Sequence, residues 1–115
     1  MVEVLANNDA SLVLRLTDDL KMENVREFFE IFAEELKESH EDVVLDLSKI
    51  RFVDSSGVGI LLKCNESLKS QDSRLIVCGL NKALLSVFKL GGLTKILSVH
   101  EKEELTDRFP ELSAD

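Results

Sequence analysis

The stretch from Asp46 to Gly59, Asp-Leu-Ser-Lys-Ile-Arg-Phe-Val-Asp-Ser-Ser-Gly-Val-Gly, decides the fold because it joins a buried strand to the start of a helix. The run Val43–Leu47, where this stretch begins, is apolar except for one acid, as expected of a strand covered on both faces. A helical pattern of apolar residues follows from Val58 to Leu68, and a second apolar run covers Arg74–Gly79. Strand, helix and strand at this spacing predict a βαβ crossover with two parallel strands.

The block Asp54-Ser55-Ser56-Gly57 stands where this helix should begin. Asp54 or Ser55 can cap the helix by accepting hydrogen bonds from its first free N–H groups. Ser56 should then project from the first turn, at the positive end of the helix dipole. Glycines at positions 57 and 59 would let another backbone approach closely.

Working outward, the chain shows further strand and helix patterns on both sides of this unit. Two short β-prone runs, separated by a turn of Asn and Asp residues, predict a hairpin with one buried face. An amphipathic helix of about four turns should follow, with apolar residues on one side and glutamates on the other. After the second parallel strand we expect a helix that ends at two glycines, then a strand and a terminal helix ending near Pro110. These elements are the strands Val2–Leu5 and Leu12–Leu16, the helix through Val25, Phe28, Phe29, Phe32 and Leu36, the helix Asn81–Leu90, the strand Lys95–Val99 and the helix Glu101–Arg108.

This order predicts a single α/β domain over residues 1–115, with an N-terminal hairpin leading into a mixed four- to five-stranded sheet and about four helices. A chain of 115 residues can bury a real core without metals or disulfides. Two cysteines inside apolar stretches, Cys64 and Cys78, suit reduced core thiols, and no CxxC spacing supports a redox pair. We predict no metal site, because His40 and His100 have no neighbouring Cys or His at ligand spacing. We also predict no cofactor.

The net charge of −8 at pH 7 is distributed unevenly along the chain. Between Asp18 and Asp46 there are eleven acids against three bases, whereas Ser48–Ile96 has eight bases against three acids. Solvated helix faces are the favoured interpretation, and a designed interaction field is the alternative. In the second case the acidic helix would meet solvent or a basic partner patch, and the basic segment would flank a separate partner site.

Composition also excludes several classes of partner. An acidic chain without Trp or Tyr disfavours direct nucleic-acid binding. The longest apolar runs are too short to span a bilayer, and an acid near the N-terminus argues against a secretory signal. We therefore expect no membrane insertion and a cytoplasmic location.

Four interpretations compete for the Asp-Ser-Ser-Gly block. A serine-hydrolase elbow would need glycine where Asp54 stands, and no motif ties either histidine to a triad. The segment Gly57-Val58-Gly59 is only a fragment of a dinucleotide-binding motif, and no Walker lysine follows it. A simple helix cap, in which both serines satisfy backbone donors, is the commonest role of such a block. The fourth interpretation is that an exposed serine of the block is phosphorylated.

A resemblance to a known family favours the fourth interpretation. The segments Val44–Ser48, Phe52–Gly59 and Leu90–Leu97 resemble those of STAS domains, which include bacterial anti-sigma factor antagonists and cytoplasmic domains of sulfate transporters. The resemblance covers nearly the whole chain, and a free-standing domain of this length is most similar to the antagonist branch.

The resemblance implies a partner-switching regulator of transcription, not an enzyme. In the antagonist branch the second serine of the block, here Ser56, is phosphorylated by an anti-sigma factor that is a serine kinase. Unphosphorylated antagonist binds the kinase and frees the sigma factor, phosphorylation releases it, and a phosphatase resets the cycle. The matching positions Asp19, Asp54, Ser55 and Gly57 are implied to form the partner surface.

One departure from the family pattern concerns the segment before the first helix. Antagonists commonly have Gly-Asp/Glu-Leu-Asp there, whereas this chain has Asp18-Asp19-Leu20-Lys21. The charge reversal at Lys21 affects the expected kinase contact. The alternative function is a STAS subunit of a lipid-transporting ABC complex, which would not be phosphorylated.

Overall fold

The computed structural model describes all residues from Met1 to Asp115 and places five strands in one mixed sheet. The spatial order of the strands is β1-β2-β3-β4-β5. The strands are β1 (Val2–Asn7), β2 (Ser11–Leu16), β3 (Asp42–Asp46), β4 (Arg74–Cys78) and β5 (Ser98–His100). Strands β1 and β2 form the predicted antiparallel hairpin, and β2, β3, β4 and β5 run parallel to their neighbours. The predicted α/β fold, hairpin and βαβ unit are therefore confirmed.

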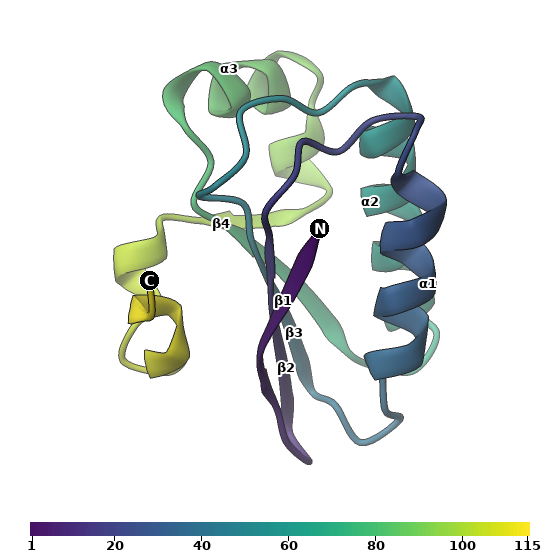
Figure 1. Ribbon diagram of the computed structural model, residues 1–115, viewed down its shortest axis with the longest axis vertical. Helices are drawn as coiled ribbons and strands as arrows, with labels where there is room; N and C mark the ends of the chain where they lie inside the picture. The colour runs from purple at the N-terminus through teal and green to yellow at the C-terminus, as the bar shows by residue number, and fades with distance from the viewer.

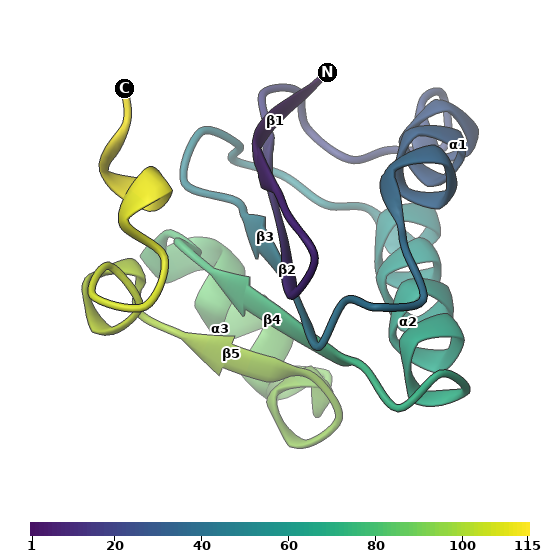
Figure 2. The same cartoon turned by 90° about the horizontal axis from the view of Figure 1, so that it is seen from below.

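Three α-helices connect the strands: α1 (Val25–Glu35), α2 (Ser55–Lys69) and α3 (Lys82–Leu90). In Figures 1 and 2, α1 and α2 lie together against one face of the sheet, whereas the C-terminal segment lies against the other. The larger core lies between the sheet and the helices, and it includes Phe28 and Phe32 of α1, Leu61 of α2 and Phe88 of α3. Helix α1 ends one residue before Leu36, whose backbone is extended, so it has about three turns instead of the expected four.

The expectation that the hairpin has one buried face is wrong for β2. Both Leu14 and its neighbour Val13 are buried, since a second apolar cluster covers the opposite face of the sheet. That cluster combines sheet residues with three residues of the C-terminal segment. Its members are Val13, Val44, Ile76, Cys78, Leu105, Phe109 and Leu112.

The C-terminal cover is not the continuous helix expected over Glu101–Arg108. It consists of two short 3-10 turns, η2 (Lys102–Glu104) and η3 (Pro110–Ser113), after an earlier turn η1 (Leu93–Lys95). Proline restricts the preceding residue to extended backbone and has no N–H to donate. Phe109 accordingly has φ −129° and ψ 74°, and this bend separates η3 from the turns before it.

A buried ion pair joins the sheet to this C-terminal cover. The Arg15 Nε donates to Asp46 Oδ2 across β2 and β3 at 2.8 Å, and both side chains are almost completely buried. The Arg15 guanidinium also donates to the Leu112 carbonyl oxygen at 3.0 Å, and Lys102 Nζ lies 3.1 Å from Asp46 Oδ2. Burial would raise the pKa of Asp46, but hydrogen bonds from the Ser48 N–H and from Arg15 outweigh it, so its pKa is lowered and the group stays ionised.

We expect Asp46→Ala to reduce the free energy of unfolding by about 3–5 kcal/mol, because Arg15 would keep a buried charge without its anion. Urea unfolding followed by circular dichroism measures this. The control is Asp42→Ala, whose arginine partners Arg74 and Arg108 are half-exposed, so its loss should be about 1 kcal/mol or less. Equal losses in the two variants would contradict the assignment.

A buried histidine at the opposite end of the sheet is held in its neutral form. The His40 Nδ1 accepts from the Lys37 N–H, and its Nε2 donates to Asn7 Oδ1, each at 2.9 Å. Burial lowers the pKa of His40 from its ordinary value of 6.5. A proton on Nδ1 would remove the acceptor for Lys37, so the folded state binds that proton less readily than the unfolded chain does.

Stability should therefore be highest above the unfolded pKa of His40 and should fall as the pH drops through 6.5 toward the lowered folded value. Comparing urea midpoints at about pH 7.5 and about pH 5.5 tests this. His40→Gln should lose this decrease, since glutamine cannot titrate, while His100→Gln should keep it. A decrease that persists in His40→Gln would assign the effect to other groups.

Candidate functional site: the start of helix α2 and its flanking loops

Two loops meet at the N-terminal end of α2. One follows β2 and the other follows β3, and a parallel bridge pairs Leu20 of the first with Val53 of the second. The Leu20 N–H donates to the Phe52 carbonyl oxygen, and the Asp54 N–H donates to the Leu20 carbonyl oxygen, both at 3.1 Å. The two loops therefore form one backbone-paired surface at the carboxyl end of the strands.

Two of the predicted site residues hold these loops together reciprocally. The Asp19 Oδ1 accepts from the Arg51 and Phe52 N–H groups at 2.8 and 3.2 Å. The Asp54 Oδ2 accepts from the Met22 N–H at 3.0 Å, in the opposite direction. Each aspartate thus fixes the loop to which it does not belong, and both are positioning residues for the surface.

Asp54 is also the cap of α2. Its Oδ1 accepts from the Gly57 N–H at 2.9 Å, which resolves the expectation that either Asp54 or Ser55 would cap. The hydrogen bond from Gly57, followed by that from Met22, lowers the pKa of Asp54 below its ordinary 3.8. Asp54 is therefore a fixed negative charge beside the first turn of the helix.

The two serines occupy the first two positions of α2, and their hydroxyls are free. Ser55 is exposed and Ser56 is partly exposed. Neither hydroxyl forms a hydrogen bond within the chain, and the cap is supplied by the preceding aspartate. The interpretation in which both serines satisfy backbone donors is therefore wrong, and both remain available to an external group.

The two glycines of the block differ in their surroundings. A Cβ added at Gly57 would lie 2.5 Å from the Leu20 carbonyl oxygen and 2.6 Å from Val53 Cγ1. At Gly59 nothing lies within 4 Å of such an atom. Close backbone approach therefore explains Gly57 and does not explain Gly59.

Two apolar side chains beside the serines were missed in the sequence. Met22 is 70% exposed and Phe52 is 51% exposed, and their backbone N–H groups are the ones fixed by Asp54 and Asp19. Exposed large apolar side chains on rigid loops are typical of protein-binding surfaces. The sequence carried no clear signal for them, because Phe52 stands in a loop beside the equally apolar Ile50 and Val53, which are buried.

Lys21 lies on the same surface and contributes positive charge. Its ammonium is 3.9 Å from Glu23 and also helps to lower the pKa of Asp54. The side chain of Lys21 is 43% exposed, so a binding partner can reach it.

Other candidate groups lie apart from this surface. Cys64 and Cys78 are free, belong to the clusters on opposite faces of the sheet, and have their pKa raised to about 12 by burial. Such thiols are unreactive near neutral pH. No group of three His, Cys, Asp or Glu side chains is placed to hold a metal, and no helix is long and apolar enough to cross a membrane.

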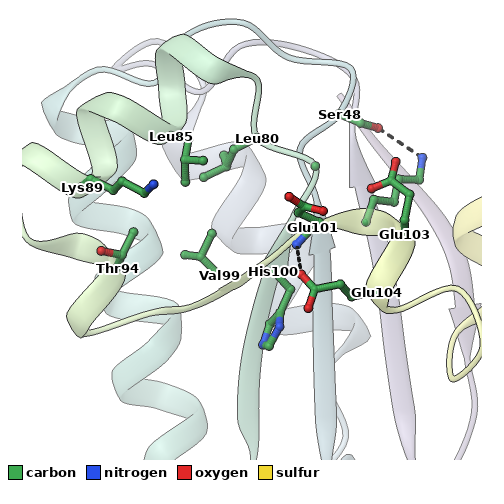
Figure 3. Close-up of a pocket in the computed structure, with 12 residues that line it drawn as sticks. Ser48, Leu80, Leu85, Lys89, Thr94, Val99, His100, Glu101, Glu103 and Glu104 are labelled. Atoms are coloured by element: carbon green, nitrogen blue, oxygen red, sulfur yellow. Dashed lines mark hydrogen bonds between the residues drawn. The ribbon is translucent and has the colours of Figure 1, made fainter.

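The largest pocket, with a volume of about 650 Å³, lies between α3, η1 and the chain after β5, as Figure 3 shows. Leu80, Leu85 and Val99 give it an apolar lining, and its polar lining mixes lysines with three glutamates. None of the predicted site residues lines it. The pocket and the serine surface are therefore separate features.

Together, the fold and the site define a class of protein: a single α/β domain whose mixed sheet presents a capped helix start with free serines. Comparison with known proteins identifies the family. Residues 4–99 match the family model described as "Mlab, STAS domain", and the chain belongs to the STAS family.

Curated relatives of the chain are bacterial anti-sigma factor antagonists. It is 32% identical to the anti-sigma-B factor antagonist of Listeria monocytogenes over 71 residues, 60% of this chain and 62% of that protein. It is 30% identical to the anti-sigma F factor antagonist of Paenibacillus polymyxa over 63 residues, 55% of this chain and 54% of the relative. The matches thus span about half to three-fifths of these relatives.

Solved structures show the same fold. The unphosphorylated anti-sigma factor antagonist SpoIIAA superposes with a TM-score of 0.76 at 22% identity, covering 94% of this chain and 95% of that one. The STAS domain of a SulP transporter from Vibrio cholerae gives a TM-score of 0.66 at 18% identity, covering 94% of this chain and 87% of that one. The predicted STAS fold is therefore confirmed.

The contact at Gly57 can be tested against its neighbour on the same helix. Gly57→Ala should lower the free energy of unfolding by about 1–3 kcal/mol, because the methyl group would collide with the Leu20 backbone. Gly59→Ala should instead raise it by about 0.5–1 kcal/mol, through better helix propensity at an open position. Denaturant midpoints give both values. Effects of the same sign would refute the distinction.

Proposed function

We propose that this chain is an anti-sigma factor antagonist that acts in the cytoplasm as a partner switch. It binds an anti-sigma factor that is a serine kinase, and phosphorylation of Ser56 releases it. The observation that carries this proposal is the free Ser56 hydroxyl on a rigid surface that also presents Met22 and Phe52. The names of the curated relatives support the same role.

The proposed partner surface consists of Met22, Phe52, Ser55 and Ser56, held by Asp19, Asp54 and Gly57. The kinase transfers the γ-phosphoryl group of ATP to the Ser56 Oγ, which loses its proton, and ADP leaves. This chain supplies the acceptor hydroxyl and no catalytic group of its own. A phosphatase restores the free hydroxyl by hydrolysis.

The position of Asp54 explains why a phosphate would act as a release signal. A phosphate adds about −1.5 to −2 charge, and a helix N-terminus normally favours an anion. Here the Gly57 N–H is already bound to the ionised Asp54 carboxylate. The phosphate must compete with Asp54 for that donor, and this competition also strains the Asp54 contact to Met22. Added charge and a loosened loop both disfavour the packed complex.

A second candidate is a STAS subunit of a lipid-transporting ABC complex, without phosphorylation. Two observations favour it: the matching family model is described by the name Mlab, and Lys21 stands where antagonists commonly have an acid. Co-purification with a transport ATPase, and no phosphate uptake from any candidate kinase, would select this function.

For the partner switch, we expect Ser56→Asp to weaken binding to the cognate kinase by at least about tenfold, or roughly 1.4 kcal/mol. Ser56→Ala should bind as the unphosphorylated protein does and remain bound when ATP is added. Isothermal titration with the purified kinase measures the affinities, and mass spectrometry after incubation with ATP locates the phosphate.

The matched control is Ser55→Asp, which adds the same charge one position earlier, on an exposed side chain. It should reduce affinity less than Ser56→Asp, and it should leave Ser56 available for phosphorylation. Equal kinase affinity of the wild type, Ser56→Asp and Ser56→Ala would exclude the switch. A phosphate found on Ser55 alone would show that Ser55 is the modified serine and that the assignment to Ser56 is wrong.

A further inference from the structure

A second exposed apolar surface lies on α3 and the turn η1 that packs against it. Leu90 is 89% exposed and Val87 is 53% exposed. Ile96, which directly follows η1, is 54% exposed. Val87 and Leu90 are three residues apart and share one face of the helix, which the exposed Ala83 extends. This α3–η1 surface, defined by Ala83, Val87, Leu90 and Ile96, contains no residue of the proposed kinase surface.

Three lysines flank the apolar centre of the α3–η1 surface, and acids approach it only on the side of Lys89, which lines the same pocket as Glu101, Glu103 and Glu104. Lys82, Lys89 and Lys95 are exposed, and none of them forms an ion pair. No acid occurs between Asp72 and Glu101, although the whole chain has a net charge of −8. An apolar centre with three unpaired lysines is complementary to a partner with an apolar stripe and acidic flanks.

We propose that the α3–η1 surface is a docking site for an acidic amphipathic helix of a partner protein. Such a helix places apolar side chains on one face at spacings of three and four residues, to meet Val87, Leu90 and Ile96. Its flanking carboxylates would pair with the three lysines. This site goes beyond the proposed phosphorylation switch, because it uses a different helix and different residues.

Two other occupants fit the surface less well. In a second copy of this chain, the acidic exposed face of α1 has no exposed large apolar side chain, and self-pairing of the α3–η1 surface would bring lysines together. An anionic membrane is usually recognised by clusters of four to eight basic residues, more than the three lysines here, and the net charge of −8 opposes it.

The test uses the full chain and a synthetic acidic helix of about 20 residues, with leucines on one face, glutamates on its flanks and a single tryptophan. The chain itself has no Trp, so the tryptophan fluorescence reports the peptide alone. We expect saturable binding that weakens with added salt. Amide shifts in a labelled sample should concentrate on α3 and η1.

The decisive variants are Leu90→Glu and Met22→Glu, which make the same change at two highly exposed apolar positions. Leu90→Glu should weaken peptide binding about tenfold or more, and Met22→Glu and Ser56→Asp should leave it unchanged. Under the proposed function, Met22→Glu should weaken kinase binding instead. The two proposals can therefore fail independently.

Several results would overturn the docking site. These are no binding of the peptide at low salt, equal affinity of Leu90→Glu and wild type, or amide shifts confined to other elements. Tighter binding to vesicles of anionic lipid than to the peptide would also overturn it. So would a dimer in sedimentation experiments that Leu90→Glu dissociates, since the occupant would then be a second copy.

Discussion

The ion pair between Arg15 and Asp46 is the constraint on which the arrangement of the molecule depends. It joins two adjacent parallel strands, and it also binds the C-terminal cover through the Leu112 carbonyl oxygen and Lys102. A charged pair in an apolar interior is costly unless hydrogen bonds offset its lost hydration, and Arg15 gains its acceptor at Leu112 only when the cover closes, although its Nη1 has no partner. The same carboxylate fixes the turn after β3, because the Ser48 N–H donates to Asp46 Oδ1 at 2.9 Å. That turn leads directly to the loop before α2.

Helix α2 therefore begins at a point that is fixed from two directions. The sheet positions the end of β3, and the reciprocal contacts of Asp19 and Asp54 lock the neighbouring loop against it. Gly57 allows the backbones to come close enough for these contacts. A side chain on such a preorganised surface loses little freedom on binding, so an added phosphate acts on a shape that is already complete.

The fold could be predicted from hydrophobic periodicity because its strands and helices alternate with clear punctuation. The Val43–Leu47 run and the Gly91-Gly92 stop each indicated the correct element. Arg15 misled the prediction, because in the sequence it is indistinguishable from a solvent-facing residue of a half-buried strand. Its partner is 31 residues away, and the cover above it is formed by residues near position 112. Long-range pairing of this kind leaves no local pattern.

The candidate site was predictable in part, for a different reason. The sequence located the block and its serines, because a cap and a helix start are local features. It did not separate Asp54 from Ser55 as the cap, nor Gly57 from Gly59, because those roles depend on the loop bearing Leu20. The exposure of Met22 and Phe52 likewise depends on the pairing of two loops, in which Met22 and Asp54 are 32 residues apart in the chain.

The C-terminal cover has a consequence for how the protein is made. Val13, Val44 and Ile76 are synthesised well before Leu105, Phe109 and Leu112, which shield them. A sheet formed without those residues would expose an apolar face and would leave Arg15 without one of its acceptors. The complete fold therefore requires the chain as far as residue 112, because only then can both faces of the sheet be covered.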